Sequence, residues 1–429
     1  MSRWKKYRIV LICILAGLII FACTYYYISI KSLLPDTLKV VAGKEMNFDL
    51  KLPVEARFCC KEKNDAKSVS INNMNAEENN NIHFSMSTPF TVNAYKTGNY
   101  NLKVKLFGLI SLKDVSINAV ENEELVPCGN TIGLHIKTNG LLVLGTGSIL
   151  CQDGSKKEPA YEIIQSGDYI KKVDGRKADS IKELQNIVQN TKKDKIKVQI
   201  IRKGYKSSVS LSVITGEDGV KKLGIWVRED TQGIGTLTFV RSDGRFGALG
   251  HGITDVDTGE LMSVKDGGIY NSEVVSIIKG RSGTPGEMMG MIMKSKEQML
   301  GSIQENTRFG IRGKVNDDKM ALFASKKTVP IGFKQEIEKG PAYILCQTDG
   351  VIKEYSVEIE KIRLGSKDNK GIVLKVTDSG LLNKTGGIIQ GMSGSPILQN
   401  GHIIGAVTHV FVNEPERGYG IFIEEMLEK

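Results

Sequence analysis

A glycine- and serine-rich hexapeptide followed by a strong hairpin signal constrains the fold of this chain more than any other feature. Residues 391–396 read Gly-Met-Ser-Gly-Ser-Pro, and Asn400-Gly401 then separates two apolar segments, the second over residues 403–411. Asn-Gly favours a two-residue turn between antiparallel strands, and glycines let the preceding loop turn tightly. A glycine-containing return over residues 417–421 follows. This order predicts a rigid serine loop backed by a β-hairpin.

The serine of this loop, Ser393, is a candidate nucleophile for acyl transfer. Such a serine needs N–H groups aimed at the oxyanion that develops on the substrate. The segment Gly391, Met392 and Ser393 is the predicted oxyanion hole, with the N–H groups of Gly391 and Ser393 as donors. An ordinary turn remains the alternative, because serine and glycine are common in turns.

A serine hydroxyl also needs a general base, which is usually a histidine. The chain has five histidines, and His251 alone lies between glycines, in the sequence Phe-Gly-Ala-Leu-Gly-His-Gly. The flanking glycines leave room for a substrate, so His251 is the predicted base. We assign His83 to a polar loop, His135 to an apolar strand, His402 to a turn and His409 to a packed core position.

The third member of a catalytic triad would orient the imidazole and stabilise its cation. Asp378 follows a predicted strand and precedes the serine loop, and is the preferred candidate. Asp255, Asp257 and Asp266 are the alternatives. A carboxylate at a strand end can also cap a turn.

These residues resemble the signatures of a known family of signalling serine peptidases from endospore-forming bacteria, that of stage IV sporulation protein B. The signatures are Ala-Leu-Gly-His-Gly around His251, Val-Thr-Asp-Ser-Gly around Asp378 and Gly-Met-Ser-Gly-Ser-Pro around Ser393. The similarity extends over further segments, at residues 233–238, 254–259, 280–286 and 408–412.

The resemblance implies a trypsin-like fold of two β-barrels and a triad of Ser393, His251 and Asp378. It also implies self-cleavage and the cleavage of a membrane-bound sporulation regulator, which starts the processing of a late sigma factor. That reaction would take place in the space between forespore and mother cell.

The amino-terminal end predicts a membrane segment. Residues 1–8 are basic and residues 9–30 are apolar, which is about the length of a bilayer-spanning helix. The basic residues should stay in the cytoplasm, so the remainder of the chain is expected outside it. A cleaved signal peptide, which would give a secreted protein, is the alternative.

The remaining sequence predicts a mainly β protein in three parts. Residues 31–119 alternate as strands do and form a small β module, residues 120–216 resemble a PDZ domain, and residues 217–429 form the peptidase domain. The last part is dense in predicted strands and glycines, as two small barrels require.

The PDZ resemblance rests on two segments and a helix. Residues 127–133 resemble a carboxylate-binding loop, residues 167–175 fit the pattern Gly-Asp-x-Ile-x-x-Val-x-Gly, and residues 180–191 have helical periodicity. A peptide would add a strand at the edge and bury its terminus in the loop. The predicted peptide-binding residues are Gly129, Asn130, Thr131, Ile132, Gly133 and Leu134. A spacer without ligand is the alternative.

The distribution of charge and the spacing of the cysteines argue against nucleic-acid binding and metal binding. Lysine and arginine exceed aspartate and glutamate by 58 − 48 = 10, but the excess is spread along the chain without interleaved aromatics, so we expect no nucleic-acid partner. No Cys-x-x-Cys pair occurs, and we expect no metal or organic cofactor. Cys128 and Cys151 are either a disulfide or buried thiols.

The sequence therefore predicts a serine endopeptidase, either membrane-tethered or secreted, that acts on protein. Two alternatives remain open. One is a PDZ adaptor with a degenerate peptidase domain that binds without cutting, and the other is a quality-control protease of broad specificity.

Overall fold

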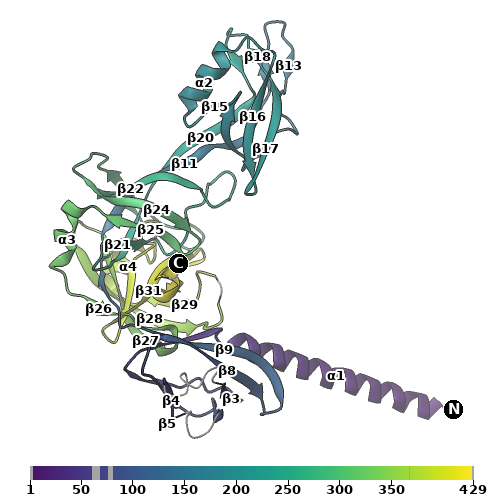
Figure 1. Cartoon of the computed structure of the whole chain (residues 1–429), viewed down its shortest axis with the longest axis vertical. Coiled ribbons are helices and arrows are strands. Elements are labelled where there is room, and N and C mark those ends of the chain that lie inside the picture. Colours follow the sequence, from purple (N-terminus) through teal and green to yellow (C-terminus); the bar gives the residue numbers. More distant parts are fainter. Residues whose placement is uncertain (1–2, 60–67, 76–80, 367, 428–429) are drawn as a thin grey trace. The chain divides into compact units, whose positions relative to one another are not determined.

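A computed structural model describes residues 3–59, 68–75, 81–366 and 368–427 of the 429-residue chain (Figure 1). Strands dominate the described residues, which confirms the predicted mainly β class. The chain divides into two compact units. The first comprises Met1–Glu124, Pro330–Gly340 and Ile359–Ile372, and the second Leu125–Val329, Pro341–Glu358 and Val373–Lys429.

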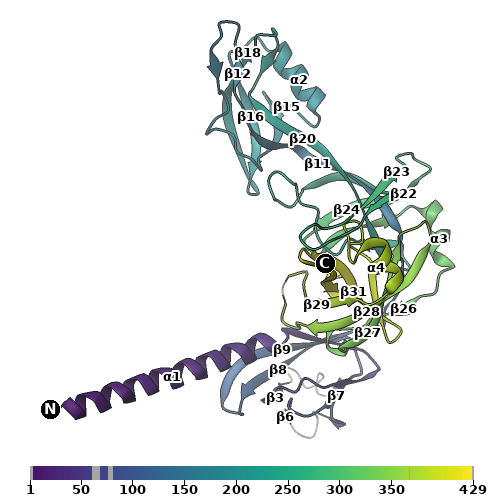
Figure 2. The ribbon, with the colours of Figure 1, turned by 180° about the vertical axis from the view of Figure 1, so that it is seen from behind.

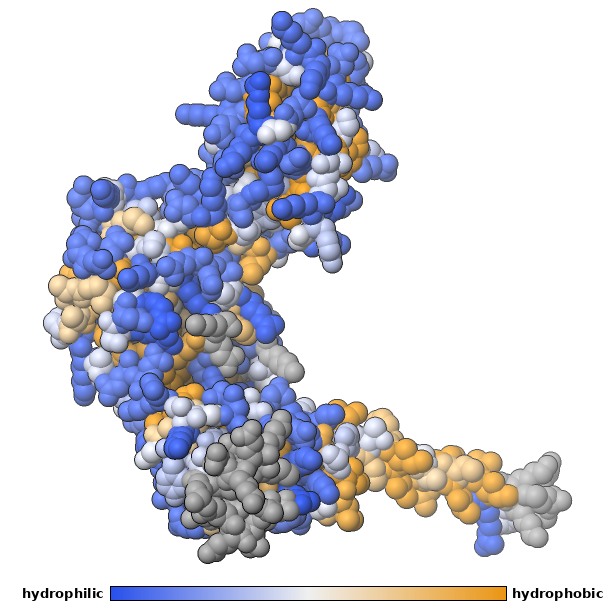
Figure 3. Space-filling view, in the orientation of Figure 1, coloured by the Kyte–Doolittle hydropathy of each residue, from blue (hydrophilic) through white to orange (hydrophobic). Residues whose placement is uncertain are grey.

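The first unit begins with the helix α1 (Arg3–Leu33), which contains the predicted apolar segment. Within its stretch Tyr7–Leu33, an 18-residue window has a mean hydropathy of 2.5 and contains no buried residue. Figure 3 shows this helix as a largely hydrophobic surface. It is long and apolar enough to cross a membrane, a property that a signal sequence shares.

Two facing sheets make up the rest of the first unit. Their elements are β1 (Thr37–Val41), β2 (Glu45–Phe48), β3 (Val54–Cys59), β4 (Val69–Ile71), β5 (Met74–Asn75), β6 (Asn81–Ser85), β7 (Phe90–Ala94), β8 (Gly98–Leu106), β9 (Ile110–Val120) and the 3₁₀ turn η2 (Lys334–Glu336). One sheet has the order β1-β9-β8-β3-β6 and the other β2-β7-β4-β5. Phe90 joins them, with its ring 4.9 Å from that of Phe84 and 5.2 Å from that of Phe48.

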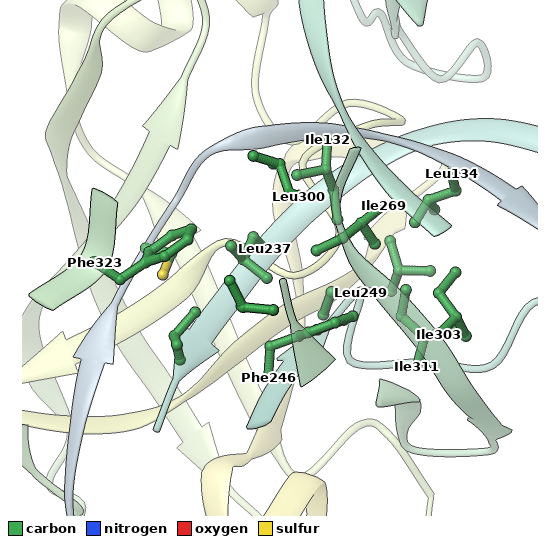
Figure 4. Close-up of a cluster of buried hydrophobic side chains, with 14 of the residues drawn as sticks. Ile132, Leu134, Leu237, Phe246, Leu249, Ile269, Leu300, Ile303, Ile311 and Phe323 are labelled. Carbon is green, nitrogen blue, oxygen red and sulfur yellow. The ribbon is translucent and has the colours of Figure 1, made fainter. Parts of the chain in front are cut away.

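The second unit contains two barrels. The elements of the first are β10 (Glu124–Pro127), β11 (Thr131–Thr146), β20 (Ile225–Val240), β21 (Arg245–Ala248), β22 (Val264–Ile278), β23 (Glu287–Ile292), β24 (Met299–Thr307), β25 (Gly310–Val315), η1 (Asp317–Lys319), α3 (Ala321–Ala324) and β26 (Val329–Pro330). The strands follow the order β11-β22-β24-β25-β21-β20, and the pairing of β20 with β11 closes this path. Figure 4 shows its core, where Ile132 and Leu134 of β11 pack near Leu237, Leu249 and Ile269.

The second barrel is closed in the order β27-β28-β29-β32-β31-β30. Its elements are β27 (Gly340–Gln347), β28 (Ile352–Ile362), β29 (Ile372–Val376), α4 (Ser379–Thr385), β30 (Pro396–Gln399), β31 (His402–Phe411), β32 (Glu414–Phe422) and α5 (Ile423–Leu427). The predicted hairpin between β30 and β31 is present. Asn400 and Gly401 have φ of 50° and 79° at its tip, as a turn of this kind requires.

A PDZ-like module is inserted between two strands of the first barrel. Its elements are β12 (Ile149–Leu150), β13 (Lys156–Lys157), β14 (Tyr169–Val173), β15 (Arg176–Lys177), α2 (Ile181–Asn190), β16 (Lys195–Arg202), β17 (Tyr205–Ser212), β18 (Ile214–Thr215) and β19 (Lys221–Lys222), with the adjoining ends of β11 and β20. Ser180 and Glu183 form a capping box that begins α2. Figures 1 and 2 show β11 and β20 running together from this module into the first barrel.

The predicted boundary of the PDZ domain at residue 120 is wrong. Residues up to Ile136 contribute to the core of the first barrel, whereas the core of the PDZ-like module begins at Leu141 and ends at Val227. The strands β11 and β20 each belong to both parts. The module is therefore an insertion into the peptidase domain and does not precede it.

Candidate active site

The serine loop connects α4 to β30 in a conformation that requires glycine. Gly391 and Gly394 have φ of 98° and 97°, a region that residues with a Cβ rarely adopt. A Cβ on Gly394 would lie 2.2 Å from the carbonyl oxygen of Thr236 and 2.5 Å from the nitrogen of Leu249. Both of these are backbone atoms of the first barrel, so the loop fits against it only with glycine at residue 394.

Two buried threonines of β20 hold the carbonyl groups of the serine loop. The Thr236 hydroxyl donates to the Gly391 carbonyl at 2.8 Å and the Thr238 hydroxyl donates to the Gly394 carbonyl at 2.7 Å. The Thr236 N–H donates to the Ser393 carbonyl at 3.0 Å. Neither threonine is among the sequence-predicted site residues, although Thr-Leu-Thr in a buried strand signals polar groups that need partners.

The backbone donors of the predicted oxyanion hole differ in their availability. Met392 N–H donates to the Ile389 carbonyl at 3.1 Å. Within the described part of the chain, the N–H groups of Gly391 and Ser393 have no intramolecular acceptor. These are the two donors that the sequence predicts, whereas Met392 is already engaged.

The Ser393 hydroxyl and the His251 ring contact consecutive residues of β31. Ser393 Oγ donates to the Thr408 carbonyl at 2.7 Å. The His251 ring lies 5.1 Å from the ring of His409, at an interplanar angle of 38°. His409 is exposed here, so its predicted place in the packed core is wrong. The contacts bring the two predicted catalytic residues to one short segment.

The loop that carries His251 is fixed by its own glycine. Leu249 and Gly250 have φ of 71° and 68°. A Cβ on Gly250 would lie 2.9 Å from Thr408 Cγ2 and 3.0 Å from Ile421 Cγ2. The loop after β21 therefore packs closely on β31 and β32, which places the first barrel's histidine beside the second barrel's serine loop.

The hydrogen bond of His251 selects its tautomer. Nδ1 lies 3.0 Å from the Gly252 carbonyl oxygen, which can only accept, so the proton is on Nδ1 and Nε2 keeps its lone pair. Burial lowers the pKa of His251 below its ordinary value, and the bond to Gly252 opposes this effect only in part. A neutral imidazole with a free Nε2 is the form that a general base needs.

Asp378 does not contact His251 in this structure. Its carboxylate accepts the N–H of Leu381 at 2.8 Å and caps the amino terminus of α4. No hydrogen bond or ion pair joins Asp378 to His251 among the described residues. The predicted contact within the triad is absent because the carboxylate satisfies the first turn of the helix.

The alternative aspartates lie elsewhere as well. Asp255 and Asp257 both pair with Arg228. Asp266 lies on β22 opposite Lys137. None of the three has a hydrogen bond to His251 in the described part of the chain.

The predicted peptide-binding loop, Gly129 to Leu134, is part of the first barrel. From Ile132 to Lys137, β11 is paired with β20 on one edge and with β22 on the other. Thr131 is held by Gln347, whose carbonyl accepts the Thr131 hydroxyl at 2.9 Å. The interpretation of this segment as a PDZ carboxylate loop is wrong, because neither edge of the strand can accept a peptide.

A groove in the PDZ-like module lies instead between α2 and the beginning of β20. It has a volume of about 1130 Å³, and its apolar lining includes Leu184, Val188, Ile225 and Val227. At residues 225–227, β20 pairs with β11 on one edge, and no strand among the described residues pairs with the other. The signal for this site is Leu-Gly-Ile at residues 223–225, a glycine turn directly before an edge strand.

The described residues include no group of three or more His, Cys, Asp or Glu side chains placed to hold a metal ion. Cys128 and Cys151 are buried free thiols and are not joined to each other. Burial raises the pKa of Cys128 to about 12, so this thiol stays protonated and inert at neutral pH.

Two six-strand paths closed into barrels, with the serine and histidine loops meeting on one strand, define a serine peptidase of trypsin-like fold. Residues 219–427 match the family model described as SpoIVB peptidase S55. This match and the fold identify the chain as a serine peptidase, an enzyme that acts on protein. The match begins after most of the PDZ-like module and does not include β11.

The chain is also similar to solved structures. For the active form of the Rv3671c protease from M. tuberculosis, the identity is 15%, the TM-score is 0.28, and the alignment covers 46% of this chain and 72% of that chain. For the PDZ domain of the SdrC-like protein from Listeria monocytogenes, the identity is 20%, the TM-score is 0.17, and the coverage is 21% and 87%. No curated protein matches the chain.

Proposed function

We propose that the chain is a membrane-anchored serine endopeptidase in which Ser393 is the nucleophile and His251 the general base. The observation that carries this proposal is that Ser393 Oγ and the His251 ring contact the adjacent residues Thr408 and His409. In the mechanism that we propose, the serine side chain leaves the Thr408 carbonyl, and its hydroxyl then donates to His251 Nε2.

The reaction follows from these groups. His251 Nε2 takes the hydroxyl proton while Ser393 Oγ attacks the scissile carbonyl carbon. The N–H groups of Gly391 and Ser393 stabilise the oxyanion. The imidazolium then gives its proton to the leaving amine, and water hydrolyses the acyl-enzyme by the same steps. The Gly252 carbonyl holds the tautomer of His251, a task for which Asp378 is predicted from sequence.

The biological role that we propose comes from the family. The apolar helix α1 anchors the protein, the basic residues before it stay in the cytoplasm, and the catalytic part lies outside. The substrate is a membrane-bound sporulation regulator, cleaved between forespore and mother cell so that processing of a late sigma factor begins. The enzyme also cleaves itself and is thereby released. The SpoIVB peptidase match supports this role.

A second function, the binding of peptide carboxyl termini, is favoured by the groove beside α2. The unpaired edge of β20 offers main-chain groups to an added strand. The apolar side chains of Leu184, Val188 and Ile225 suit an apolar last residue. This groove replaces the predicted loop as the site for peptide termini.

The test of the peptidase uses the full chain in detergent with a fluorophosphonate probe, which reacts with an activated serine and loses fluoride. We expect the wild-type protein to be labelled at Ser393 and to trim itself, as followed by intact-mass spectrometry. Ser393→Ala and His251→Ala should do neither, whereas His402→Ala, at the hairpin tip, should behave as wild type.

The outcomes separate the alternatives. A folded wild-type protein that is neither labelled nor able to cut would favour the PDZ adaptor with a degenerate peptidase domain. Rapid digestion of unfolded casein would favour a quality-control protease, whereas cleavage of one membrane-bound regulator supports the signalling role.

A further inference from the structure

The strand β20 borders the peptide groove and also carries Arg228, which pairs with the loop that follows His251. Residues 225–227 line the groove, and Arg228 follows them on β20. Its guanidinium pairs with Asp255 and, at 2.7 Å, with Asp257. Both aspartates belong to the loop between His251 and β22.

The Asp255 carboxylate organises this loop from inside. Its side chain is fully buried, and its Oδ1 accepts the N–H groups of Asp257 and Thr258 at 3.0 Å each. Its Oδ2 accepts from Arg228. A buried carboxylate depends on such partners, so the loop conformation and the position of Arg228 are linked.

The same loop packs on the PDZ-like module. Met262 forms a buried apolar cluster with Leu142 and Tyr169, and Ile253 packs against this cluster. The Ser263 N–H donates to the Tyr169 hydroxyl at 3.2 Å. The loop therefore has polar and apolar contacts with the module, and its first residue adjoins His251.

We propose that Arg228, Asp255 and Asp257 are positioning residues that couple peptide binding in the groove to the placement of His251. This inference rests on the proposed peptidase function. The ligand is a peptide with an apolar last residue and a free carboxylate, and it acts as an activator.

The direction of the effect follows from the geometry of the site. Ser393 Oγ is bonded to the Thr408 carbonyl, so the serine–histidine pair still has to be assembled. A peptide strand added at residues 225–227 fixes the backbone next to Arg228. A ligand that binds one position of the coupled loop more tightly shifts the population toward it. In our proposal the peptide-bound position is the one in which His251 accepts the Ser393 hydroxyl once this has left the Thr408 carbonyl.

The experiment measures the rate of fluorophosphonate labelling of Ser393 in the full chain in detergent. The activator is a synthetic decapeptide that ends in valine with a free carboxylate, and its amide is the control. Binding is measured separately by fluorescence anisotropy. Couplings between sites are typically 5- to 150-fold, so we expect saturating peptide to raise the wild-type rate at least about fivefold.

Three variants test whether the coupling between the groove and His251 depends on the pairing of Arg228 with the loop that follows His251. Arg228→Gln and Asp257→Asn should bind the peptide with wild-type affinity, yet their labelling rate should respond less than about twofold to it. Asp257 is about half exposed, so Asp257→Asn should fold. This variant tests the coupling even if Arg228→Gln fails to fold. Lys265→Gln removes a different ion pair to the module, with Asp179 at 2.8 Å, and should keep the full response.

The refuting results are distinct. A wild-type protein that is labelled at Ser393 but does not respond to bound peptide overturns the coupling and leaves the peptidase intact. The coupling is also overturned, with the peptidase intact, if Asp257→Asn responds to the peptide as strongly as wild type or if the decapeptide does not bind. A wild-type protein never labelled at Ser393, with or without peptide, overturns the peptidase function and this inference with it.

Discussion

Replacing Asp378 by asparagine separates a capping role of this residue from a catalytic one. The carboxylate accepts the Leu381 N–H at 2.8 Å at the beginning of α4. The asparagine side-chain oxygen can accept the same hydrogen bond, and asparagine is as good an N-cap as aspartate. We therefore expect Asp378→Asn to melt within a few degrees of wild type and to label at Ser393 within about threefold of the wild-type rate.

The alanine variant measures how much the cap contributes to the stability of the folded protein. Asp378→Ala removes the acceptor and leaves the Leu381 N–H without its cap, at a cost of about 1 kcal/mol. A loss of this size lowers the melting temperature by about 2–4 °C in a domain of 150–250 residues. The two variants should therefore differ in stability more than in the chemistry at Ser393.

The assay pairs thermal unfolding with the labelling rate, both on the full chain in detergent. Loss of the aspartate from a catalytic triad by substitution with asparagine costs about 10⁴-fold in rate. If Asp378→Asn unfolds like wild type but labels about 10⁴-fold more slowly, the carboxylate orients His251 during catalysis and our reasoning from the cap is refuted.

Three further predictions concern the serine loop, the base and the barrel. Gly394→Ala should abolish labelling, because its Cβ would lie 2.2 Å from a backbone oxygen. Gly401→Ala is the control: it also places alanine at a positive φ, but no atom lies within 4 Å of its Cβ, so it should still be labelled at Ser393. The labelling rate should rise with pH through a midpoint below about 6.5, because burial lowers the pKa of His251 and only the neutral ring accepts a proton; a midpoint above that value would contradict the burial argument. A fragment of residues 219–427 should not label at Ser393, because without β11 the first barrel, which carries His251, stays open between β20 and β22; labelling at the full-chain rate would show that β11 is dispensable.

The turn and loop conformations that the sequence predicts correctly are encoded locally. Asn400-Gly401 forms the turn that its dipeptide favours, with positive φ at both residues. Gly391 and Gly394 mark the tight loop around Ser393, and both have positive φ. Each of these signals depends on the conformational freedom of one or two residues, and no distant partner is needed to interpret it.

Asp378 shows where a local signal has two meanings. A carboxylate after a strand fits the third member of a triad, and it equally fits the N-cap of a helix that follows. The structure has the cap, with Leu381 N–H as the donor. Only the position of His251, which lies in the other barrel, can decide between the two, and sequence spacing does not give that position.

The misplaced peptide loop has a long-range cause. A glycine turn before an apolar strand occurs at residues 129–134 and again at residues 223–227, and the local sequence does not say which strand has a free edge. Ile132 pairs with Gly235 on one side and with Asn271 on the other. These partners are distant in sequence, so the occupied edges of β11 become visible only in the folded sheet.

The insertion of the PDZ-like module explains why the candidate active site and the groove share one strand. Since β20 begins at the groove and continues into the first barrel, Thr236 reaches the serine loop from the strand that contains Ile225. A module that merely preceded the barrel would need only a linker, and its contacts could change without moving the site. Here the backbone of one strand, β20, connects the two, so that a shift at one end is transmitted along this strand toward the other. The fold thus favours a peptidase whose site responds to what its own module binds.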